Sequence, residues 1–491
     1  MSGALLALSF PPLPFFILAF IGFVPLLFVF NESNYTHKFN FLSLYLAFFV
    51  YHAGSNWWIS SWQEQTDPYL FISGIALALA HPFFFMVPFW FFFLIRKKIG
   101  YERALWFFPF IWVAFEWLHS LGEASYPWLT VGNTQIKNIY WVQFIDITGV
   151  WGASLLIVFI NVLVYFSINR IIANKGTSFI RLLKQDYNLK IYLLSIFLIV
   201  LFPFLYSVDR VFEYNHEKML EENESVNISL VQPNIDPWKK WSGGAFSQVQ
   251  MHKRIQDSIS EEAGDIDLSI WSETAIPYIN LSVNARHKYS FIQRWVDRHG
   301  FSLLTGFSEF YIYGDDEKPQ FPHKKLAIDN DRPYNTFNSV LLLNPRFFKN
   351  DTVQIYRKTK LTPFAERIPY VEKISFAQEW LTWGVGISAW GQGEGAHALT
   401  VMNRDDTLKI GTINCIESIY PKFVTGFVND GAEILSIVTN DAWYNYTAGP
   451  MQHYLIGAMR AIENRRYIAR CANSGVTGFI SPTGKTIHKA E

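Results

Sequence analysis

The sequence predicts two parts, a multi-span α-helical membrane domain followed by an α/β domain. Composition is the first reason: 50% of the 491 residues are hydrophobic, 18% are aromatic and only 17% are charged, whereas soluble domains usually carry about 25% charged residues. The apolar excess is also confined to residues 1–207, while residues 208–491 have an ordinary globular composition. Finally, short β-branched runs alternate with helix-like stretches throughout the second part, which is typical of α/β domains.

The first part, residues 1–207, is predicted to contain about six spans, because a helical span needs roughly 20 mostly apolar residues. Pro11, Pro12 and Pro14 interrupt the first apolar stretch, so it is either one kinked helix or a tight hairpin. A cleaved signal peptide is not expected, because no basic residues precede this stretch and it is too long. The predicted spans lie near residues 5–30, 40–61, 69–95, 104–120, 141–167 and 190–207.

The basic loops predict the orientation of this first part. Loops 96–103 and 169–190 are rich in Lys and Arg and should therefore be cytoplasmic. Loops 62–68 and 121–140 have no Lys or Arg before Lys137, so they should lie on the opposite side. The last span would then deliver residues 208–491 to the outer side of the membrane.

Four polar residues lie within or beside the predicted spans: Asn56, Glu116, His119 and Asp146. Ionisable groups inside a membrane are functional candidates by default. Each of these residues also lies near the end of a span, where its side chain could simply reach the interface. The sequence alone leaves both interpretations open.

Charge and cysteine content exclude several classes of function. The 41 Lys and Arg residues balance the 41 Asp and Glu residues, which argues against a nucleic-acid partner. The two cysteines, Cys415 and Cys471, are too few for a disulfide framework, and their spacing fits no metal site. We therefore expect neither a metal ion nor another cofactor.

Eight strand-like runs and three helix-like stretches predict the α/β part, residues 208–491. In open α/β sheets, ligands bind at the carboxyl ends of the strands. Residues that end a strand are therefore candidates for function. The strand-like runs are 227–233, 268–273, 301–307, 337–343, 408–415, 433–440, 467–473 and 475–481, and the helix-like stretches are 245–262, 284–299 and 449–465.

Three segments end in chemically useful groups: run 268–273 ends in Glu273, the further β-prone segment TVQIYRK (352–358) ends in Lys358, and run 408–415 ends in Cys415. A thiol becomes a nucleophile when a base takes its proton or a cation stabilises the thiolate, and a cation can also stabilise an oxyanion. Each residue has a simpler interpretation, because a lone cysteine is commonly a small buried hydrophobe and Glu or Lys at a strand end is commonly solvated. The long, patterned loops 356–369 and 439–453 favour a functional site.

Nine motifs follow one another along the chain in the order of a known family. With them, residues 208–491 resemble the nitrilase superfamily, whose members have an αββα sandwich and a Glu–Lys–Cys triad, and the whole chain resembles bacterial apolipoprotein N-acyltransferases. The motifs are NWW (56–58), YPWLTVGNTQ (126–135), VQPNIDPWKKW (231–241), WSETAIP (271–277), YNTFNS (334–339), YRKTKLTPFAERIP (356–369), NCIES (414–418), TNDAWY (439–444) and RAIENRRYIARCANSGVTG (460–478).

The resemblance implies a role for each member of the triad. Glu273 would be the general base, Lys358 the cation that stabilises the oxyanion, and Cys415 the nucleophile. Lys360 is the rival for the role of the lysine, and the family pattern K-x-x-L-x-P-F favours Lys358.

The resemblance also implies residues that support the triad. Glu366 matches a further carboxylate near it, although Ala365 replaces the glycine that precedes this carboxylate in the family. Glu417 matches the acid after the cysteine. The remaining candidates are Asn335 and Asn440, expected to support the active-site loops, and Trp241 with Trp238 on a loop over the site.

The reaction that the resemblance implies is a ping-pong acyl transfer at the bacterial inner (cytoplasmic) membrane, with the catalytic domain on the periplasmic side. Cys415 would take an acyl chain from a phospholipid, expected to be phosphatidylethanolamine, as a thioester. The N-terminal amine of a diacylglyceryl-cysteine in an apolipoprotein would then accept it. Phe376, Trp380 and Trp383 would either dip into the interface or belong to the core. The resemblance also implies a last transmembrane helix, which this sequence does not contain.

Two other functions remain open from the sequence. A membrane-tethered amidase of the nitrilase type would use the same triad to hydrolyse a small amide, and it would need no lipid. A membrane scaffold with an inactive domain would need no triad at all, and the presence of Glu273, Lys358 and Cys415 argues against it.

Overall fold

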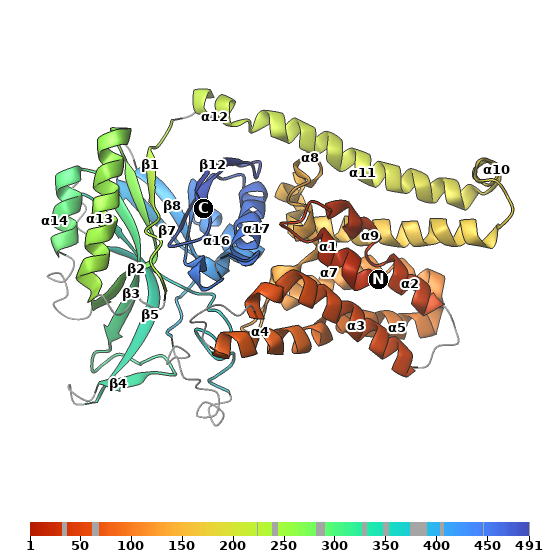
Figure 1. Ribbon diagram of the computed structural model, residues 1–491, viewed down its shortest axis with the longest axis horizontal. Coiled ribbons are helices and arrows are strands. Elements are labelled where there is room, and N and C mark those ends of the chain that lie inside the picture. Colours follow the sequence, from red (N-terminus) through yellow and green to blue (C-terminus); the bar gives the residue numbers. More distant parts are fainter. Residues whose placement is uncertain are drawn as a thin grey trace. The chain divides into compact units, whose positions relative to one another are not determined.

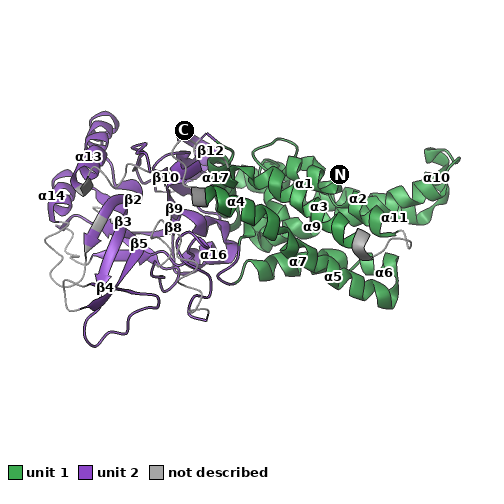
Figure 2. Ribbon diagram, turned by 60° about the horizontal axis from the view of Figure 1, so that its bottom comes forward, with its two compact units in different colours: residues 1–121, 126–215, 447–463 green, residues 122–125, 216–446, 464–491 purple. Residues whose placement is uncertain are grey.

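The computed structural model spans residues 1–491 and describes all of them except 32–36, 61–67, 223, 238–243, 281–289, 327–330, 347–352, 374–389, 403–406, 445 and 491. The chain divides into two compact units (Figure 2). Unit 1 comprises residues 1–121, 126–215 and 447–463. Unit 2 comprises residues 122–125, 216–446 and 464–491.

Unit 1 is helical. Three of its helical stretches, among the described residues, are long and apolar enough to cross a membrane: Leu70–Ile99, Ile145–Ala173 and Tyr187–Glu213. They correspond to three of the predicted spans. Figure 1 labels most of the helices, which are α1 (Ser2–Ser9), α2 (Val24–Asn31), α3 (His37–Asn56), α4 (Pro68–Ala80), α5 (Pro82–Ile99), α6 (Tyr101–Leu105), α7 (Phe108–His119), α8 (Ile139–Val142), α9 (Ile145–Ala173), α10 (Phe179–Gln185), α11 (Tyr187–Glu213) and α17 (Gly449–Asn464, all but its last residue).

The first predicted span is a hairpin and not one kinked helix. Helix α1 ends at Ser9, immediately before the proline-rich turn, and the chain then returns through a 3-10 helix, Phe16–Ile21, to α2. The Leu26 N–H donates to Ser2 Oγ at 3.1 Å, which ties α2 to the start of α1. On α9, Asn161 accepts from the Phe23 N–H and donates to the Ala19 carbonyl, both at 2.8 Å, so its side chain fixes the returning segment.

The interior of unit 1 is largely aromatic. The fully buried Trp112 on α7 lies 4.6 Å from Phe23 and 5.9 Å from both Phe48 and Phe85, measured between ring centroids. The Phe23 and Phe85 rings meet Trp112 edge to face and the Phe48 ring is stacked on it, and such arrangements add to the free energy gained by burial. The aromatic residues that made this part look membrane-embedded therefore also build its core.

Unit 2 contains two six-stranded sheets. In the first sheet, β1 (Ile228–Val231), β2 (Leu268–Asn280) and β3 (Ser302–Ile312) are parallel, and β5 (Arg332–Leu343) runs antiparallel to β3. Strands β4 (Lys324–Leu326) and β6 (Gln354–Arg357) both pair with β5. The second sheet has the order β12–β11–β10–β9–β8–β7, made of β7 (Ala398–Met402), β8 (Thr407–Asn414), β9 (Ile434–Thr439), β10 (Ile468–Ala472), β11 (Thr477–Ile480) and β12 (Thr486–Ala490).

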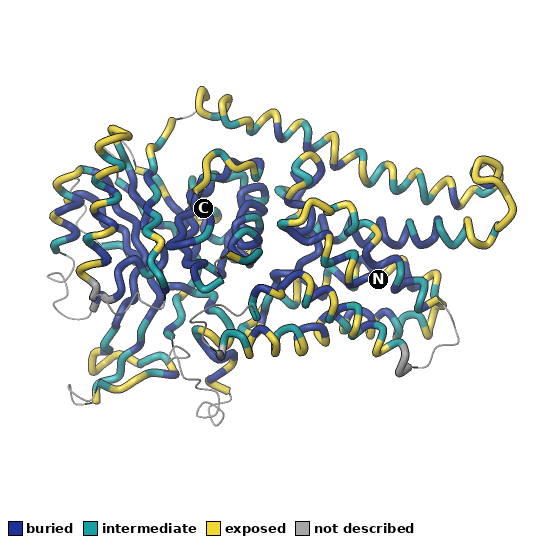
Figure 3. The backbone as a smooth tube through the Cα atoms, viewed as in Figure 1, coloured by how far each residue is buried: buried dark blue, intermediate teal, exposed yellow. Residues whose placement is uncertain are grey.

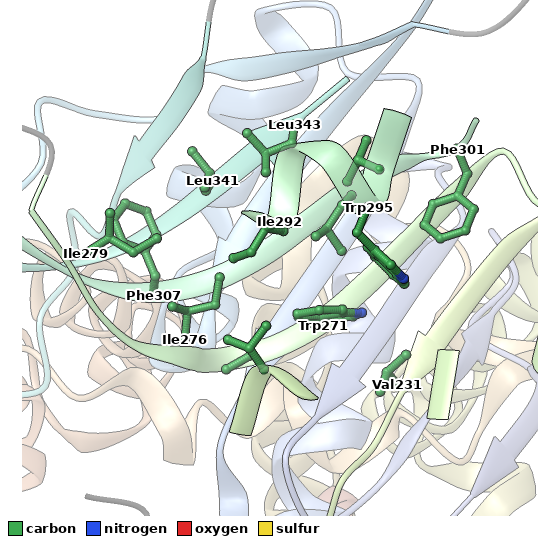
Figure 4. Packing of buried hydrophobic residues seen from close by; sticks show 14 residues of the cluster. Val231, Trp271, Ile276, Ile279, Ile292, Trp295, Phe301, Phe307, Leu341 and Leu343 are labelled. Atoms are coloured by element: carbon green, nitrogen blue, oxygen red, sulfur yellow. The ribbon is translucent and has the colours of Figure 1, made fainter. Parts of the chain in front are cut away.

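The two sheets pack face to face between helices. The Cys471 thiol on β10 donates to the carbonyls of Val231 and Ile270, which lie on the first sheet. Helices α13 (Gly244–Ala263) and α14 (Ser290–His299) cover the other face of the first sheet, where Trp295 packs beside Trp271 (Figure 4). Helix α16 (Pro421–Asn429) packs on the second sheet. The predicted αββα sandwich is thus confirmed, and strands of its interior such as β3, β9 and β10 are almost continuously buried (Figure 3).

An irregularity in β2 depends on a glycine of the neighbouring strand. The pairing of β2 with β3 shifts register between Trp271 and Ile276. A Cβ added to Gly306 on β3 would lie 2.5 Å from the Thr274 nitrogen and 2.7 Å from the Glu273 Cα. Because these are backbone atoms, they cannot move aside as the end of a flexible side chain can.

We therefore expect Gly306→Ala to destabilise unit 2 by about 1–3 kcal/mol, the usual cost of overpacking a core. The measurement is thermal or denaturant unfolding of the full chain in detergent. Gly314→Ala is the matched control, because a Cβ there has no neighbour closer than 3.7 Å. Equal stability of the two variants would contradict this account of the irregularity.

Candidate active site

The structure brings the three predicted triad residues to one place from three strands. Lys358 follows β6 directly and Cys415 follows β8 directly, as the sequence predicted. Glu273 differs, because β2 does not end there but continues to Asn280. Glu273 instead leaves the regular pairing at the register shift between Trp271 and Ile276, so an irregularity within the strand takes the place of a strand end.

A buried lysine lies at the centre of the cluster. The Lys358 side chain is only 1% exposed, and its Nζ lies 3.4 Å from Glu273 Oε1 and 2.9 and 3.0 Å from the two carboxylate oxygens of Glu366. Burial alone would lower the pKa of Lys358, but Glu366 and Glu273 raise it above its ordinary value. Lys358 is therefore cationic at neutral pH.

Glu366, predicted to lie near the triad, contacts it directly. Its carboxylate accepts hydrogen bonds from Lys358 and from the Thr362 N–H, the latter at 2.8 Å. Burial would raise the pKa of Glu366, but Lys358 and these donors hold it below its ordinary value. Glu366 is therefore an anion that partners the lysine.

Asn338, which sequence reasoning missed, connects all parts of the cluster. Its Nδ2 donates to Glu273 at 2.7 Å and to Glu366 at 2.9 Å, and its Oδ1 accepts from Asn414 Nδ2 at 2.9 Å. Its backbone carbonyl accepts from the Lys358 N–H at 2.8 Å. Asn338 thus holds both carboxylates in place and ties them to the residue that precedes Cys415.

Cys415 has an unusual backbone conformation. Its φ is +53°, which is uncommon for a residue other than glycine and persists only where the surrounding structure imposes it. Cys415 begins the 3-10 helix Cys415–Ile419 and is partly exposed. A sharp turn at the end of a buried strand therefore presents the sulfur at the edge of the sheet.

Burial raises the pKa of the Cys415 thiol well above its ordinary value. The negative charge of Glu273 adds to this rise, whereas Lys358 and a hydrogen bond with the Thr439 side chain oppose it. The resting site therefore holds a neutral thiol beside a carboxylate. Such a pair suits a reaction in which the base takes the proton as the sulfur attacks.

The loop after β9 forms another side of the cysteine site. Thr439 Oγ1 donates to Asp441 Oδ1 at 3.0 Å, and the fully buried Arg470 donates to Asp441 Oδ2 at 2.5 Å. Burial raises the pKa of Tyr444 to about 12, and the nearby Cys415 contributes to this rise. The TNDAWY motif therefore lines the site.

The side chain of Glu417 connects two loops by four hydrogen bonds, which we call the Glu417 bracket. Its Oε1 accepts from the Tyr356 hydroxyl at 2.6 Å and from the Thr359 and Lys360 N–H groups at 2.7 and 3.0 Å. Its Oε2 accepts from the Asn414 N–H at 2.8 Å. One buried carboxylate therefore fixes the turn that carries Cys415 against the segment that follows Lys358.

Lys360, the rival for the role of the triad lysine, points elsewhere. Its Nζ lies 5.3 Å from the centre of the Tyr420 ring, an arrangement typical of a cation–π contact. Only its backbone N–H takes part in the bracket made by Glu417. The contacts of Lys358 with Glu273 and Glu366 thus favour Lys358.

Of the two predicted supporting asparagines, Asn335 lies on β5 and Asn440 in the loop after β9. Asn335 accepts from the Tyr313 hydroxyl at 2.9 Å and donates to the Pro322 carbonyl at 2.7 Å. Asn440 accepts from Asn473 at 3.0 Å, and Asn473 in turn donates to the Ile235 carbonyl at 2.7 Å.

The predicted aromatic residues of the loops cannot be placed. Trp238 and Trp241 lie outside the described residues, as do Phe376, Trp380 and Trp383. Within the described part of the chain, no group of three His, Cys, Asp or Glu residues could hold a metal ion.

Comparison with known proteins identifies the family. The model of the apolipoprotein N-acyltransferase N-terminal domain matches residues 2–163, and that of carbon-nitrogen hydrolase matches residues 227–491. The chain is 34% identical to the apolipoprotein N-acyltransferase of Chlorobaculum tepidum, over 99% of this chain and 86% of that protein. It belongs to the apolipoprotein N-acyltransferase family.

Other relatives agree with this assignment. The apolipoprotein N-acyltransferase of Geobacter metallireducens is 28% identical over 99% of this chain and 84% of its own length. Apolipoprotein N-acyltransferase 1 of Treponema denticola is 28% identical over 99% of this chain and 86% of its own length. The solved structure of Saccharomyces cerevisiae Nit3, a member of branch 10 of the nitrilase superfamily, matches with a TM-score of 0.38 at 15% identity, covering 54% of this chain and 85% of that one. The family assignment rests on the two family models and the relatives.

The high pKa of the Cys415 thiol predicts how this N-acyltransferase reacts with iodoacetamide. Alkylation should accelerate steadily from neutral to alkaline pH, without the early plateau of a low-pKa thiolate. Lys358→Met should slow alkylation further at each pH, because the lysine favours the thiolate. Intact-mass analysis measures the rate, and Cys415→Ala separates it from reaction at Cys471. A plateau at neutral pH would contradict the prediction.

The contacts of Asn338 predict a positioning role. Asn338→Ala should lower the kcat of acyl transfer on the order of 100-fold, because small displacements of reacting groups cost about this much, and it should leave Cys415 open to alkylation. Asn335→Ala is the matched control on the same strand: it should cost stability through its unpaired partners but leave kcat nearly unchanged. Equal losses of kcat would contradict this role.

Proposed function

We propose that this chain transfers an acyl chain from a membrane phospholipid to the N-terminal amine of the diacylglyceryl-cysteine of an apolipoprotein. The observation that carries the proposal is the buried Glu273–Lys358 pair beside the Cys415 thiol, in a chain whose family is that of the apolipoprotein N-acyltransferases. The donor in this proposal is phosphatidylethanolamine. Residues 1–207 hold the chain in the inner membrane as a multi-pass domain, and residues 208–491 form the catalytic domain on the periplasmic side.

The first half of the reaction acylates Cys415. Glu273 takes the thiol proton of Cys415 while the sulfur attacks the ester carbonyl of the phospholipid. Lys358 stabilises the oxyanion that forms on the carbonyl oxygen, a task suited to a fixed cation in a buried site. The carbon–oxygen bond then breaks, the departing lysophospholipid takes the proton back from Glu273, and a thioester remains on Cys415.

The second half transfers the acyl chain from Cys415 to the amine. The uncharged amine of the diacylglyceryl-cysteine attacks the thioester carbonyl, and Glu273 takes one of its protons. The carbon–sulfur bond breaks, the sulfur recovers that proton, and the acyl chain leaves as an amide. The same three residues therefore serve both steps, and Glu366, Glu417 and Asn338 keep them in place.

The competing amidase would pass the thioester to water. The match of residues 2–163 to the N-terminal domain of apolipoprotein N-acyltransferase argues for lipid-anchored substrates instead. The long apolar helices of unit 1 also favour substrates that reside in a membrane, since a small soluble amide would require no such region.

The decisive experiment is intact-mass analysis of the purified chain after incubation with phosphatidylethanolamine. We expect a mass increase of one acyl chain that hydroxylamine removes, because hydroxylamine cleaves thioesters. Cys415→Ala should show no adduct, and Glu273→Gln should form it far more slowly, on the order of 100-fold or more, since it lacks the base. A diacylglyceryl peptide should then remove the adduct and gain the acyl chain.

Other results would overturn the proposal. An acyl adduct that persists in Cys415→Ala would place the chemistry on another residue. The absence of any adduct, together with ready alkylation of Cys415, would show a reactive thiol with a different donor. Turnover of a small amide without lipid would then favour the amidase.

A further inference from the structure

The connection between α9 and α11 contains a short helix of its own. Figure 1 shows this helix, α10, where α9 ends and α11 begins. Ser178 Oγ accepts from the Arg181 N–H at 3.4 Å and caps the start of α10. Asp186 accepts from the Leu189 N–H at 3.0 Å and caps the start of α11 in the same way. Helix α10 therefore has a defined place between its neighbours, and the proposed acyl transfer uses none of its residues.

One side of α10 is apolar and only partly covered by the protein. Phe179, Ile180, Leu182 and Leu183 share this side, because successive residues of a helix turn by about 100°. Leu182 is buried against the rest of unit 1, whereas Phe179 is 52% and Ile180 is 69% exposed. Tyr187, at the start of α11, is exposed as well. Apolar side chains gathered on a surface in this way indicate contact with a membrane or another molecule.

The other side of α10 is basic. Arg181 and Lys184 lie there and are exposed, and Lys175 is exposed in the turn that precedes the helix. The segment 169–190 contains five basic residues and one acidic residue, Asp186. The Asp186 carboxylate caps α11 and is the single acidic group within this segment that could offset the cations. The segment therefore presents an excess of positive charge beside the exposed apolar side chains.

The helices on either side of α10 indicate what surrounds it. Both α9 and α11 are long and apolar enough to cross a membrane, and only 6% of the apolar stretch of α11 is buried within the protein. Leu194, Phe197 and Phe202 of α11 are each more than half exposed. Lipid acyl chains are the environment that suits such a surface. Because α9 ends and α11 begins beside α10, the short helix lies at the level where acyl chains give way to headgroups.

The two sides of α10 together favour one occupant. An acidic protein segment would match Arg181 and Lys184 but would leave Phe179 and Ile180 uncovered. A lipid surface meets both requirements, because acyl chains cover the apolar side and headgroup phosphates attract the cations. A zwitterionic phospholipid such as the proposed acyl donor has no net charge, so the excess of cations favours an anionic phospholipid instead.

We propose that α10 and the turn before it form a binding surface for anionic phospholipids. The helix lies in the plane of the membrane surface, with Phe179 and Ile180 among the acyl chains. Lys175, Arg181 and Lys184 bind the phosphates of the headgroups. The proposal rests on the membrane domain proposed above, and it is independent of the acyl transfer.

The first test measures where α10 lies in the bilayer. An environment-sensitive fluorophore is attached to Ile180→Cys in the full chain in lipid nanodiscs, in a Cys415→Ala background whose remaining Cys471 is buried. Lipids that carry bromine on their acyl chains should quench this fluorophore. Phe197→Cys on α11 is the positive control, and Arg298→Cys, at an exposed position of unit 2, is the negative control.

The positive control separates two kinds of failure. Quenching at position 197 without quenching at position 180 would overturn the proposal and leave the membrane domain intact. The absence of quenching at both positions would overturn the membrane domain and, with it, the surface that rests on it.

The second test measures which lipid class α10 binds, from the hydrogen exchange of its backbone amides in nanodiscs. Exchange should slow when phosphatidylglycerol replaces part of the phosphatidylcholine. A triple variant, Lys175→Gln with Arg181→Gln and Lys184→Gln, should lose most of this protection, since the affinity for an anionic surface falls roughly fivefold with each cation removed.

A matched triple variant in unit 2 controls for the loss of three charges. It removes exposed arginines from α13 and α14 and should keep the full protection by phosphatidylglycerol. Equal exchange of α10 in both lipids, or full protection in the α10 triple variant, would overturn the proposal. The control substitutions are Arg254→Gln, Arg294→Gln and Arg298→Gln.

Discussion

The buried ammonium of Lys358 is the constraint on which the proposed catalytic cluster depends. Its removal from water would be very costly without partners, and two carboxylates, Glu273 and Glu366, compensate for it. With one cation and two anions, the resting cluster carries a charge of −1. Transfer of the Cys415 proton to Glu273 moves this negative charge from oxygen to sulfur and leaves the total unchanged. Lys358 therefore faces an anion at every stage, so the site need not reorganise as the reaction proceeds.

Polar groups that carry no reacting atom give this cluster its fixed geometry. Asn338 can donate two hydrogen bonds and uses one for each carboxylate, so the Oε1 atoms of Glu273 and Glu366 that contact Lys358 are also held by this amide. Glu417 accepts four hydrogen bonds and ties the backbone after Lys358 to the backbone before Cys415. The strained φ of Cys415 persists because this bracket holds the turn. Positioning and charge balance are thus divided between different residues.

The residues at strand ends could be predicted from the sequence. Which side chains of a strand lie on which face of its sheet could not. Lys358 and Cys415 were predicted from the rule that ligands bind at the carboxyl ends of strands, although β6 and β8, which they follow, belong to different sheets. Asn335 and Asn338 both lie on β5, three residues apart in a stretch of continuous register, so their side chains point to opposite faces. The sequence does not reveal which face meets the carboxylates, so it did not single out Asn338. Glu273 was predicted as the end of a strand, but β2 continues beyond it. The register shift opposite Gly306 is what takes Glu273 out of the regular pairing and into the cluster.

A cluster of three histidines in unit 1 lay beyond sequence reasoning for a related reason. His52, His81 and His119 share no periodic spacing, and only the packing of α3, α5 and α7 brings their rings together. Seen alone, His119 at the end of a predicted span could simply have reached the interface. Its ring instead lies 2.9 Å from His81, which in turn contacts His52, so it belongs to a cluster of hydrogen-bonded rings. The spacing of the sequence therefore could not distinguish a side chain that reaches the interface from one that packs in a polar cluster.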